Sequence, residues 1–190
     1  FLVDKCWIVR EPNYEYFDKE LQWYLSKSLN INDIPGGAPT MWKACATENG
    51  YINSNYGWCI FSNENGNQYE GCLNKLVNDQ HTREAIMIYN RPSMQTDYNK
   101  DGMHDFMCCQ NVQYFINEDE YGNEFLDCIV NFRSNDAVFG FNNDALWAKY
   151  VLDQLANELT SILKRTIKPR NIYWNAGSLH IYERHFKFLE

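Results

Sequence analysis

The stretch RSNDAVFGFNND, residues 133–144, carries the strongest structural and chemical signal in this chain. It follows a segment, 125–132, whose apolar residues predict a β-strand, and it leads into a helical pattern that begins near Asp144. Arg133 and Ser134 place a guanidinium fork beside a hydroxyl, which suits recognition of a phosphate group. The alternative reading is an ordinary ion pair at the end of a strand.

Helical and extended patterns surround this stretch. Apolar residues recur at a spacing near 3.6 in two segments, which predicts amphipathic helices over residues 14–29 and from Asp144 onward. The expected apolar faces are Phe17, Leu21, Tyr24, Leu25 and Leu29 in the first helix, and Trp147, Val151, Leu155, Leu159 and Ile162 in the second. A further helix is expected over 69–76, and strands over 85–89, 106–116, 125–132, 172–174 and 179–182. These elements predict an α+β fold with a mixed or antiparallel sheet.

The composition narrows the classes of partner. The chain has 190 residues, which is enough for one domain with a sizeable core. Its 17 basic and 25 acidic residues give a net charge of −8, which argues against a nucleic acid polymer as partner. A single nucleotide phosphate needs only a few local donors and is compatible with this charge. Aromatic residues make up 16% of the chain and offer flat surfaces on which a base can stack.

The cysteines indicate a reducing compartment. There are seven, an odd number without a CxxC pair, which fits neither a disulfide framework nor a zinc site. We therefore expect reduced thiols, no metal and a cytoplasmic location, which is the host cytoplasm if the source is viral. The sequence contains no 18-residue apolar run and no signal peptide, so we expect no membrane partner.

Cys108 is the candidate nucleophile, in the run DFMCCQNVQY, residues 105–114. A thiolate adds readily to C6 of a pyrimidine ring, which a hydroxyl attacks only with difficulty. Such a thiolate needs a cationic neighbour, and Arg133 is the candidate. The alternative is a small buried hydrophobic residue within a strand.

Cys108, the 133–136 motif, Asp144 and the His180–Tyr182 pair occur in an order that resembles the thymidylate synthase superfamily. The match is closest to its phage-type deoxycytidylate hydroxymethylases and runs from about Glu15 to His185. The resemblance implies a thymidylate synthase-type fold. It also implies a single domain over residues 1–190 that lacks the terminal segments of the family.

The resemblance assigns roles to further residues. It implies catalytic roles for Cys108, Glu20, Tyr56 and Asp144, and folate-side roles for Trp42 and Asp136. It implies nucleotide binding by Arg83, Gln113, Arg133, Ser134, Asn135, Asp144, His180 and Tyr182, with the last two on the 3′-hydroxyl. Without the resemblance, Glu20 reads as a solvated helix residue, Trp42 and Tyr56 as core aromatics, and the His180–Tyr182 pair as a half-buried strand.

Asp144 distinguishes the subclass, because the synthases have at this position an Asn that reads uracil. Cytosine offers an amino donor at N4 and an acceptor at N3, and a carboxyl group that shares a proton with N3 satisfies both. The alternative role for Asp144 is capping of the helix that begins there. Cys109, which stands where synthases have His, also fits the hydroxymethylases.

The implied reaction is folate-dependent transfer of one carbon to C5 of dCMP through a Cys–C6 adduct. It gives 5-hydroxymethyl-dCMP for modified DNA synthesis and uses 5,10-methylenetetrahydrofolate as co-substrate. Two alternatives stay open, namely a thymidylate synthase acting on dUMP and an inactive protein that binds pyrimidine nucleotides. The family also implies a homodimer through back-to-back sheets, in which Arg83 reaches the partner's phosphate. Glu84 replaces the second Arg of the family, a reversal of charge.

Overall fold

The computed structural model describes residues 1–189 and divides into two compact units. The sheet unit comprises Phe1–Pro12, Tyr69–Met87 and the chain from Cys109 onward. The helical unit comprises Asn13–Gln68 and Ile88–Cys108. The expectation of a single domain over residues 1–190 stays a prediction.

A mixed four-stranded sheet organises the sheet unit, in the order β1-β2-β3-β5. Strand β2 (Cys109–Glu118) pairs antiparallel with β3 (Glu124–Phe132), and β3 pairs parallel with β5 (Ile167–Ala176). The short β1 (Ile86–Ile88) forms the other edge. The α+β class with a mixed sheet is therefore confirmed.

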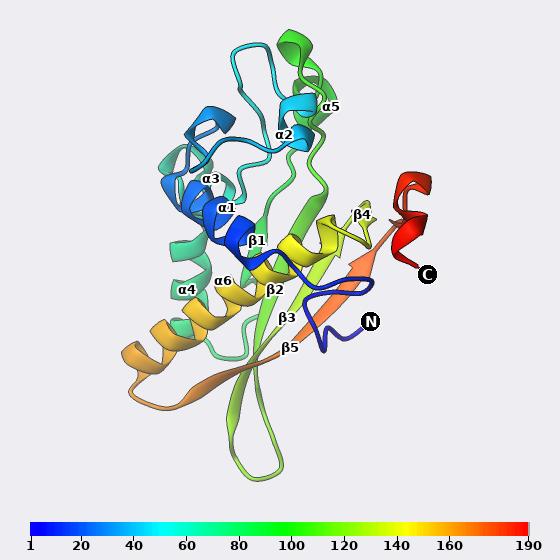
Figure 1. Cartoon of the computed structure of the whole chain (residues 1–190). Coiled ribbons are helices and arrows are strands. Elements are labelled where there is room, and N and C mark those ends of the chain that lie inside the picture. Colours follow the sequence, from blue (N-terminus) through cyan, green and yellow to red (C-terminus); the bar gives the residue numbers. More distant parts are fainter. Residues whose placement is uncertain (190) are drawn as a thin grey trace. The chain divides into compact units, whose positions relative to one another are not determined.

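Helix α6 (Gly140–Leu163) connects the parallel strands β3 and β5 and lies across one face of the sheet (Figure 1). Parallel neighbours require such a crossover. Trp147, Val151, Leu155 and Leu159 are buried, as their spacing predicts, whereas Ile162 is exposed. The helix begins four residues before Asp144, because the Asp136 carboxylate accepts a hydrogen bond from Val138 N (3.1 Å) and turns the chain earlier.

Three smaller elements complete the sheet unit. Strands β4 (Asn135–Asp136) and β6 (Leu179–His180) pair parallel as a separate two-stranded sheet. The 3₁₀ helix η4 (Glu183–Phe188) follows β6, and most of α4 (Gln68–Asn78), expected over 69–76, belongs to this unit.

The helical unit is built on α1 (Tyr14–Ser26) and α3 (Tyr56–Phe61), which pack against each other. Helix α1 ends earlier than the predicted residue 29, because Lys27 adopts a left-handed conformation with φ 60°. The other helices are α2 (Thr40–Cys45), α5 (Met94–Asp97), η1 (Ile31–Asp33), η2 (Asn63–Asn65) and η3 (Lys100–Gly102).

The strand predicted over 106–116 begins only at Cys109, so Cys108 lies outside the ladder. The preceding segment is held by hydrogen bonds within the helical unit, where Asp105 N donates to Tyr98 O (2.9 Å). Among residues 1–189, no helix combines the length and apolar character needed to cross a membrane.

Candidate active site

Glu20 is buried in the helical unit, at 3% exposure, rather than solvated. Its Oε1 accepts hydrogen bonds from the Tyr16 hydroxyl (2.7 Å) and the Trp42 indole nitrogen (2.9 Å). Burial, together with the Glu20 charge, raises the pKa of Tyr16, so the phenol stays a donor. The structure thus brings Glu20 and Trp42 together, and it adds Tyr16, which the sequence analysis missed although it lies one helical turn before Glu20.

Tyr56 is the first residue of α3, where two features fix its position. The Asn55 side chain caps the helix by accepting from Trp58 N (2.7 Å), and it donates to two carbonyl groups at the end of α1 and beyond. Its neighbour Gly57 packs so closely on α1 that an added Cβ would lie 1.8 Å from Tyr24 O. The Tyr56 ring, itself buried, stacks on Tyr24 at 5.4 Å between centroids.

Gly57→Ala is expected to destabilise the protein by about 1–3 kcal/mol or more, because the backbone of α1 must move to admit the methyl group. The matched control is Gly71→Ala, at an exposed position of α4 with no atom within 4 Å of an added Cβ. That change should stabilise the helix by about 0.5–1 kcal/mol. Thermal unfolding of both variants checks the pair, and equal effects would contradict the close approach of α1 and α3.

A buried polar network precedes Cys108, and no local pattern in the sequence predicts it. The carboxylate of Asp105 accepts from Asn53 N (2.7 Å), Ser54 N (2.8 Å) and Ser54 Oγ (2.6 Å). Arg91 in turn donates to Asn53 Oδ1 (2.9 Å). Burial raises the pKa of Asp105, against the opposing effect of these donors.

This network joins the segment that leads to Tyr56 with the segment that ends at Cys108. Cys108 is half-buried, and its thiol lies 3.8 Å from Phe106 O. The only sequence signal was a pair of short polar motifs, Asn53–Ser54 and Asp105, about 50 positions apart. Local patterns give no indication that such distant residues meet.

In the sheet unit, Asn135 and Asp144 form a direct pair. Asn135 Nδ2 donates to Asp144 Oδ2 at 2.7 Å. Asp144 is the fifth residue of α6 and not its cap, since Phe139 occupies the cap position without a side-chain hydrogen bond. The capping alternative for Asp144 is therefore wrong. Gly140 lies beside this pair, and an added Cβ would make ordinary contacts with Asn135 Nδ2 at 3.7 Å and Asp144 Oδ2 at 3.8 Å.

The β4–β6 pairing places Asp136 beside His180. The rings of His180 and Tyr182 lie 4.9 Å apart in an edge-on arrangement, as expected for two residues on one face of an extended segment. Asp136 Oδ1 accepts from Val138 N, and Oδ2 lies 3.9 Å from His185 Nδ1.

Arg133 is exposed and Ser134 is half-buried at the end of β3. The turn after β5 packs on this corner, where Ser178 N donates to Arg133 O (3.1 Å) and an added Cβ at Gly177 would lie 2.9 Å from the same oxygen. Elsewhere in the unit, Gln113 Nε2 donates to the carbonyl of the exposed Arg83 (2.8 Å).

Glu84 Oε2 lies 2.6 Å from Lys75 Nζ, and the hydrogen bond and charge of this ammonium group lower the pKa of the Glu84 carboxyl group. Lys75 of α4 thus balances the negative charge that Glu84 introduces at this position.

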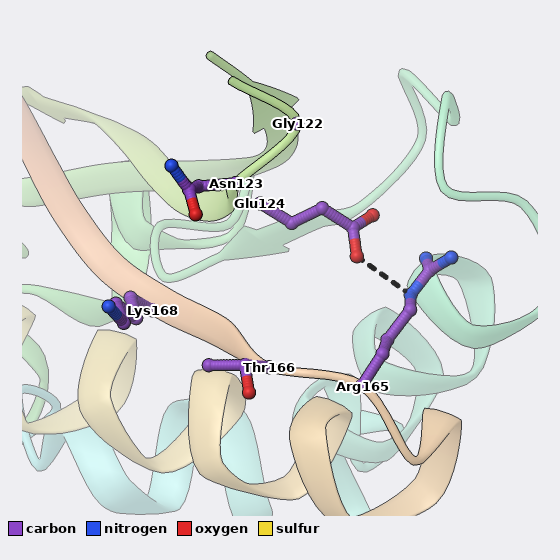
Figure 2. Close-up of a pocket in the computed structure, with 6 residues that line it drawn as sticks. All are labelled: Gly122, Asn123, Glu124, Arg165, Thr166 and Lys168. Atoms are coloured by element: carbon purple, nitrogen blue, oxygen red, sulfur yellow. Dashed lines mark ion pairs between the residues drawn. The ribbon is translucent and has the colours of Figure 1, made fainter. Parts of the chain in front are cut away.

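A pocket of about 390 Å³ lies where the β2–β3 hairpin approaches the turn between α6 and β5 (Figure 2). It is lined by Gly122, Asn123, Glu124, Arg165, Thr166 and Lys168, and Arg165 pairs with Glu124 at 3.0 Å. None of the predicted site residues lines it. Within residues 1–189, no cluster of three or more His, Cys, Asp or Glu side chains could hold a metal, and the seven cysteines form no disulfide.

Comparison with known proteins decides the family. The thymidylate synthase family model matches residues 9–190. The chain belongs to the thymidylate synthase family. The deoxycytidylate 5-hydroxymethyltransferase of Enterobacteria phage T4 is 50% identical to it over 191 aligned residues, which cover the whole chain and 76% of that protein.

More distant members of the family match less of the chain or match it more weakly. The thymidylate synthase of Francisella philomiragia is 24% identical, over 88% of this chain and 61% of that protein. Thermostable thymidylate synthase A from Bacillus subtilis superposes with a TM-score of 0.66 at 21% identity, over the whole chain and 66% of that chain. The thymidylate synthase-type fold is therefore confirmed.

Proposed function

We propose that this protein transfers a one-carbon unit to C5 of dCMP and forms 5-hydroxymethyl-dCMP. The observation that carries the proposal is the 50% identity, over the full chain, with the phage T4 deoxycytidylate 5-hydroxymethyltransferase. The Asn135–Asp144 pair supports the choice of base, because a half-buried carboxyl group accepts from an amino group and shares a proton with a ring nitrogen.

Cys108 is the proposed nucleophile. Its thiolate adds to C6 of the pyrimidine, which makes C5 electron-rich. Its position supports this role, because it is half-buried and outside the β-ladder, whereas Cys109 is buried as the first residue of β2. Arg133 and Ser134 are proposed to bind the phosphate, and His180 and Tyr182 the 3′-hydroxyl.

Glu20 and Tyr56 are proposed to move the proton that leaves C5. Glu20 already accepts two hydrogen bonds in a buried position, which is the environment in which a carboxyl group can also hold an ordered water. Tyr56 is held by the Asn55 cap and the Gly57 contact, which limits its freedom at the start of α3.

The co-substrate implied by the family is 5,10-methylenetetrahydrofolate, which supplies the one-carbon unit when bound. Trp42 and Asp136 are suited to hold it. Trp42 is half-buried with its indole nitrogen held by Glu20, so its ring is oriented for contact with a flat pterin or aryl group. Asp136 is half-buried and presents carboxylate acceptors, which suit the amino and N–H groups of a pterin edge.

Release of tritium from C5-labelled dCMP, with and without the folate, tests this function. A hydroxymethyltransferase releases tritium in step with product when the folate is present, and a protein that merely binds nucleotides releases none with or without it. Parallel assays with dCMP, CMP and dUMP identify the substrate. Faster turnover of dUMP than of dCMP would favour the thymidylate synthase alternative.

We further propose a homodimer through the sheet. Trp174 and Ile172 of β5 are buried, with Trp174 against Phe141 of α6, whereas Tyr173 and Asn175 point to the other face and are exposed. An asparagine ladder crosses that face, with Asn175 donating to Asn131 (3.0 Å) and Asn131 to Asn111 (2.9 Å). This exposed polar face, opposite to the face that packs on α6, supports pairing with a second copy.

Arg83 is expected to act on the partner's phosphate, so two defective chains should complement each other. Arg83→Ala and Cys108→Ser homodimers should each be impaired, whereas the mixed dimer contains one intact site. Random pairing should restore about a quarter of the wild-type sites. Activity of the mixture, measured with heterodimer formation confirmed by differently tagged chains, checks this. No recovery would count against phosphate binding across the dimer.

A further inference from the structure

Asn135 has a buried side chain of which, within the described part of the chain, only one polar atom is hydrogen-bonded. It is buried at 3% exposure in β4, and its Nδ2 makes one hydrogen bond, to Asp144 Oδ2. Its Oδ1 is enclosed by protein and has no hydrogen-bond partner among the described residues 1–189. A buried polar atom left unpaired is destabilising, and an apolar residue of similar size would avoid that cost.

The pair has a fixed sense, because Nδ2 is the Asn135 atom that lies at hydrogen-bonding distance from Asp144 Oδ2. The NH₂ end of the amide must therefore face Asp144, and Oδ1 must face away into the unpaired position. A hydrogen bond donated to a carboxylate favours its charged form over its neutral form. The enclosed site strengthens this effect, since water competes little for the donor.

We propose that Asn135 is a positioning residue that keeps Asp144 ionised, so that the proton between Asp144 and a bound cytosine resides on N3 of the base. This inference rests on the proposed function and assigns to Asn135 the control of base activation. One proton is taken up from solvent when dCMP binds. Uracil already carries a proton on N3, so dUMP binding takes up none.

Protonation of N3 assists the attack by Cys108. When the sulfur–C6 bond forms, the electron pair of the C5–C6 double bond shifts to form a double bond between C4 and C5. The electron pair of the C4–N3 double bond moves onto N3 and cancels its positive charge. A neutral ring would have to place negative charge on N3 instead, so the protonated ring is the better electrophile. Asn135 therefore acts on the rate of addition more than on the affinity for dCMP.

Asn142 provides a matched control. It is also buried at 3% exposure in the sheet unit, and its Oδ1 also has no partner in the part of the chain that the structure describes. Its Nδ2, however, donates to the backbone carbonyls of Arg10 (3.0 Å) and Val138 (3.2 Å), and not to Asp144. Loss of the Asn142 amide should therefore affect the stability of the fold. Loss of the Asn135 amide should instead affect the location of the proton between Asp144 and cytosine N3.

The test is the ¹⁵N NMR signal of dCMP labelled at N3 in its binary complex with the protein, which needs no turnover. The wild-type complex should show N3 at the position of protonated cytosine. Asn135→Ala should move the signal toward neutral cytosine and lower kcat for dCMP by tenfold or more, with KM changed less. Asn142→Ala should leave the signal in the wild-type position and lower the melting temperature more than Asn135→Ala does.

A neutral N3 in the wild-type complex would overturn the proposal, as would an Asn135→Ala complex with the wild-type signal. If Asn135→Ala does not fold, Asn135→Val, which fills the space without a donor, takes its place. The wild-type spectrum decides the location of the proton in either case. Failure of the wild-type protein to release tritium from C5-labelled dCMP refutes the proposed function itself, whereas tritium release with a neutral N3 refutes only the role of Asn135.

Discussion

Replacement of Cys108 by serine is expected to abolish turnover while dCMP binding changes by no more than about tenfold, or roughly 1.4 kcal/mol. The thiolate forms its bond to C6 only after the nucleotide is bound, so affinity depends little on it. A serine hydroxyl is too weakly acidic to supply an equivalent nucleophile. The position of Cys108, half-buried just before β2, leaves the sulfur outside the hydrogen-bonded ladder.

Cys109→Ser is the matched control for this experiment. Cys109 is 2% exposed and is the first residue of β2, so its replacement should affect stability more than chemistry. Steady-state rates and equilibrium dCMP binding should be measured for both variants. A near wild-type rate in Cys108→Ser, or loss of activity only in Cys109→Ser, would show that the nucleophile is assigned to the wrong residue.

Asp144→Asn is expected to move the preference from dCMP toward dUMP by at least tenfold. The amide can donate to O4 and accept from N3–H of uracil, but against cytosine it must leave one polar group mispaired. One such contact costs roughly 1–3 kcal/mol when it is removed from water. The change replaces a carboxyl oxygen that accepts from Asn135, so the amide must present its own oxygen to that donor. That oxygen has a second lone pair, which can accept from uracil N3–H while the NH₂ group donates to O4.

Asp153→Asn makes the same chemical change in the same helix at a distance from the Asn135 pair. The Asp153 carboxylate pairs with Lys149 Nζ at 2.9 Å within α6, so Asp153→Asn should leave the nucleotide preference unchanged. The ratio of kcat/KM for dCMP and dUMP, measured for both variants, decides the question. An unchanged ratio in Asp144→Asn would refute the reading of cytosine by this residue.

Local patterns in the sequence were sufficient for the main elements, and the resemblance to known proteins gave the family. The 3.6 spacing predicted α1 and the buried face of α6, and the apolar runs predicted β2 and β3 to within a few residues. The order of Cys108, Arg133–Ser134, Asp144 and His180–Tyr182 pointed to the thymidylate synthase family, which the family match confirmed. Periodicity and motif spacing are properties of neighbouring residues, so a single sequence contains them.

The environment of the site residues was decided only by tertiary structure. Glu20 appeared solvated on a helix, yet the contact with Trp42, 22 positions away, buries it. Helix capping, the alternative role for Asp144, was excluded only by the structure, because the turn at Asp136 moved the start of α6 to Gly140.

Asn135 and Asp105 gave no local signal for the pairs they form. The first meets Asp144 where β4 pairs with β6, and the second joins segments about 50 positions apart. A hydrogen bond between distant residues depends on how the chain closes its loops and packs its elements. Residue types that are compatible with several partners do not specify which one they will meet.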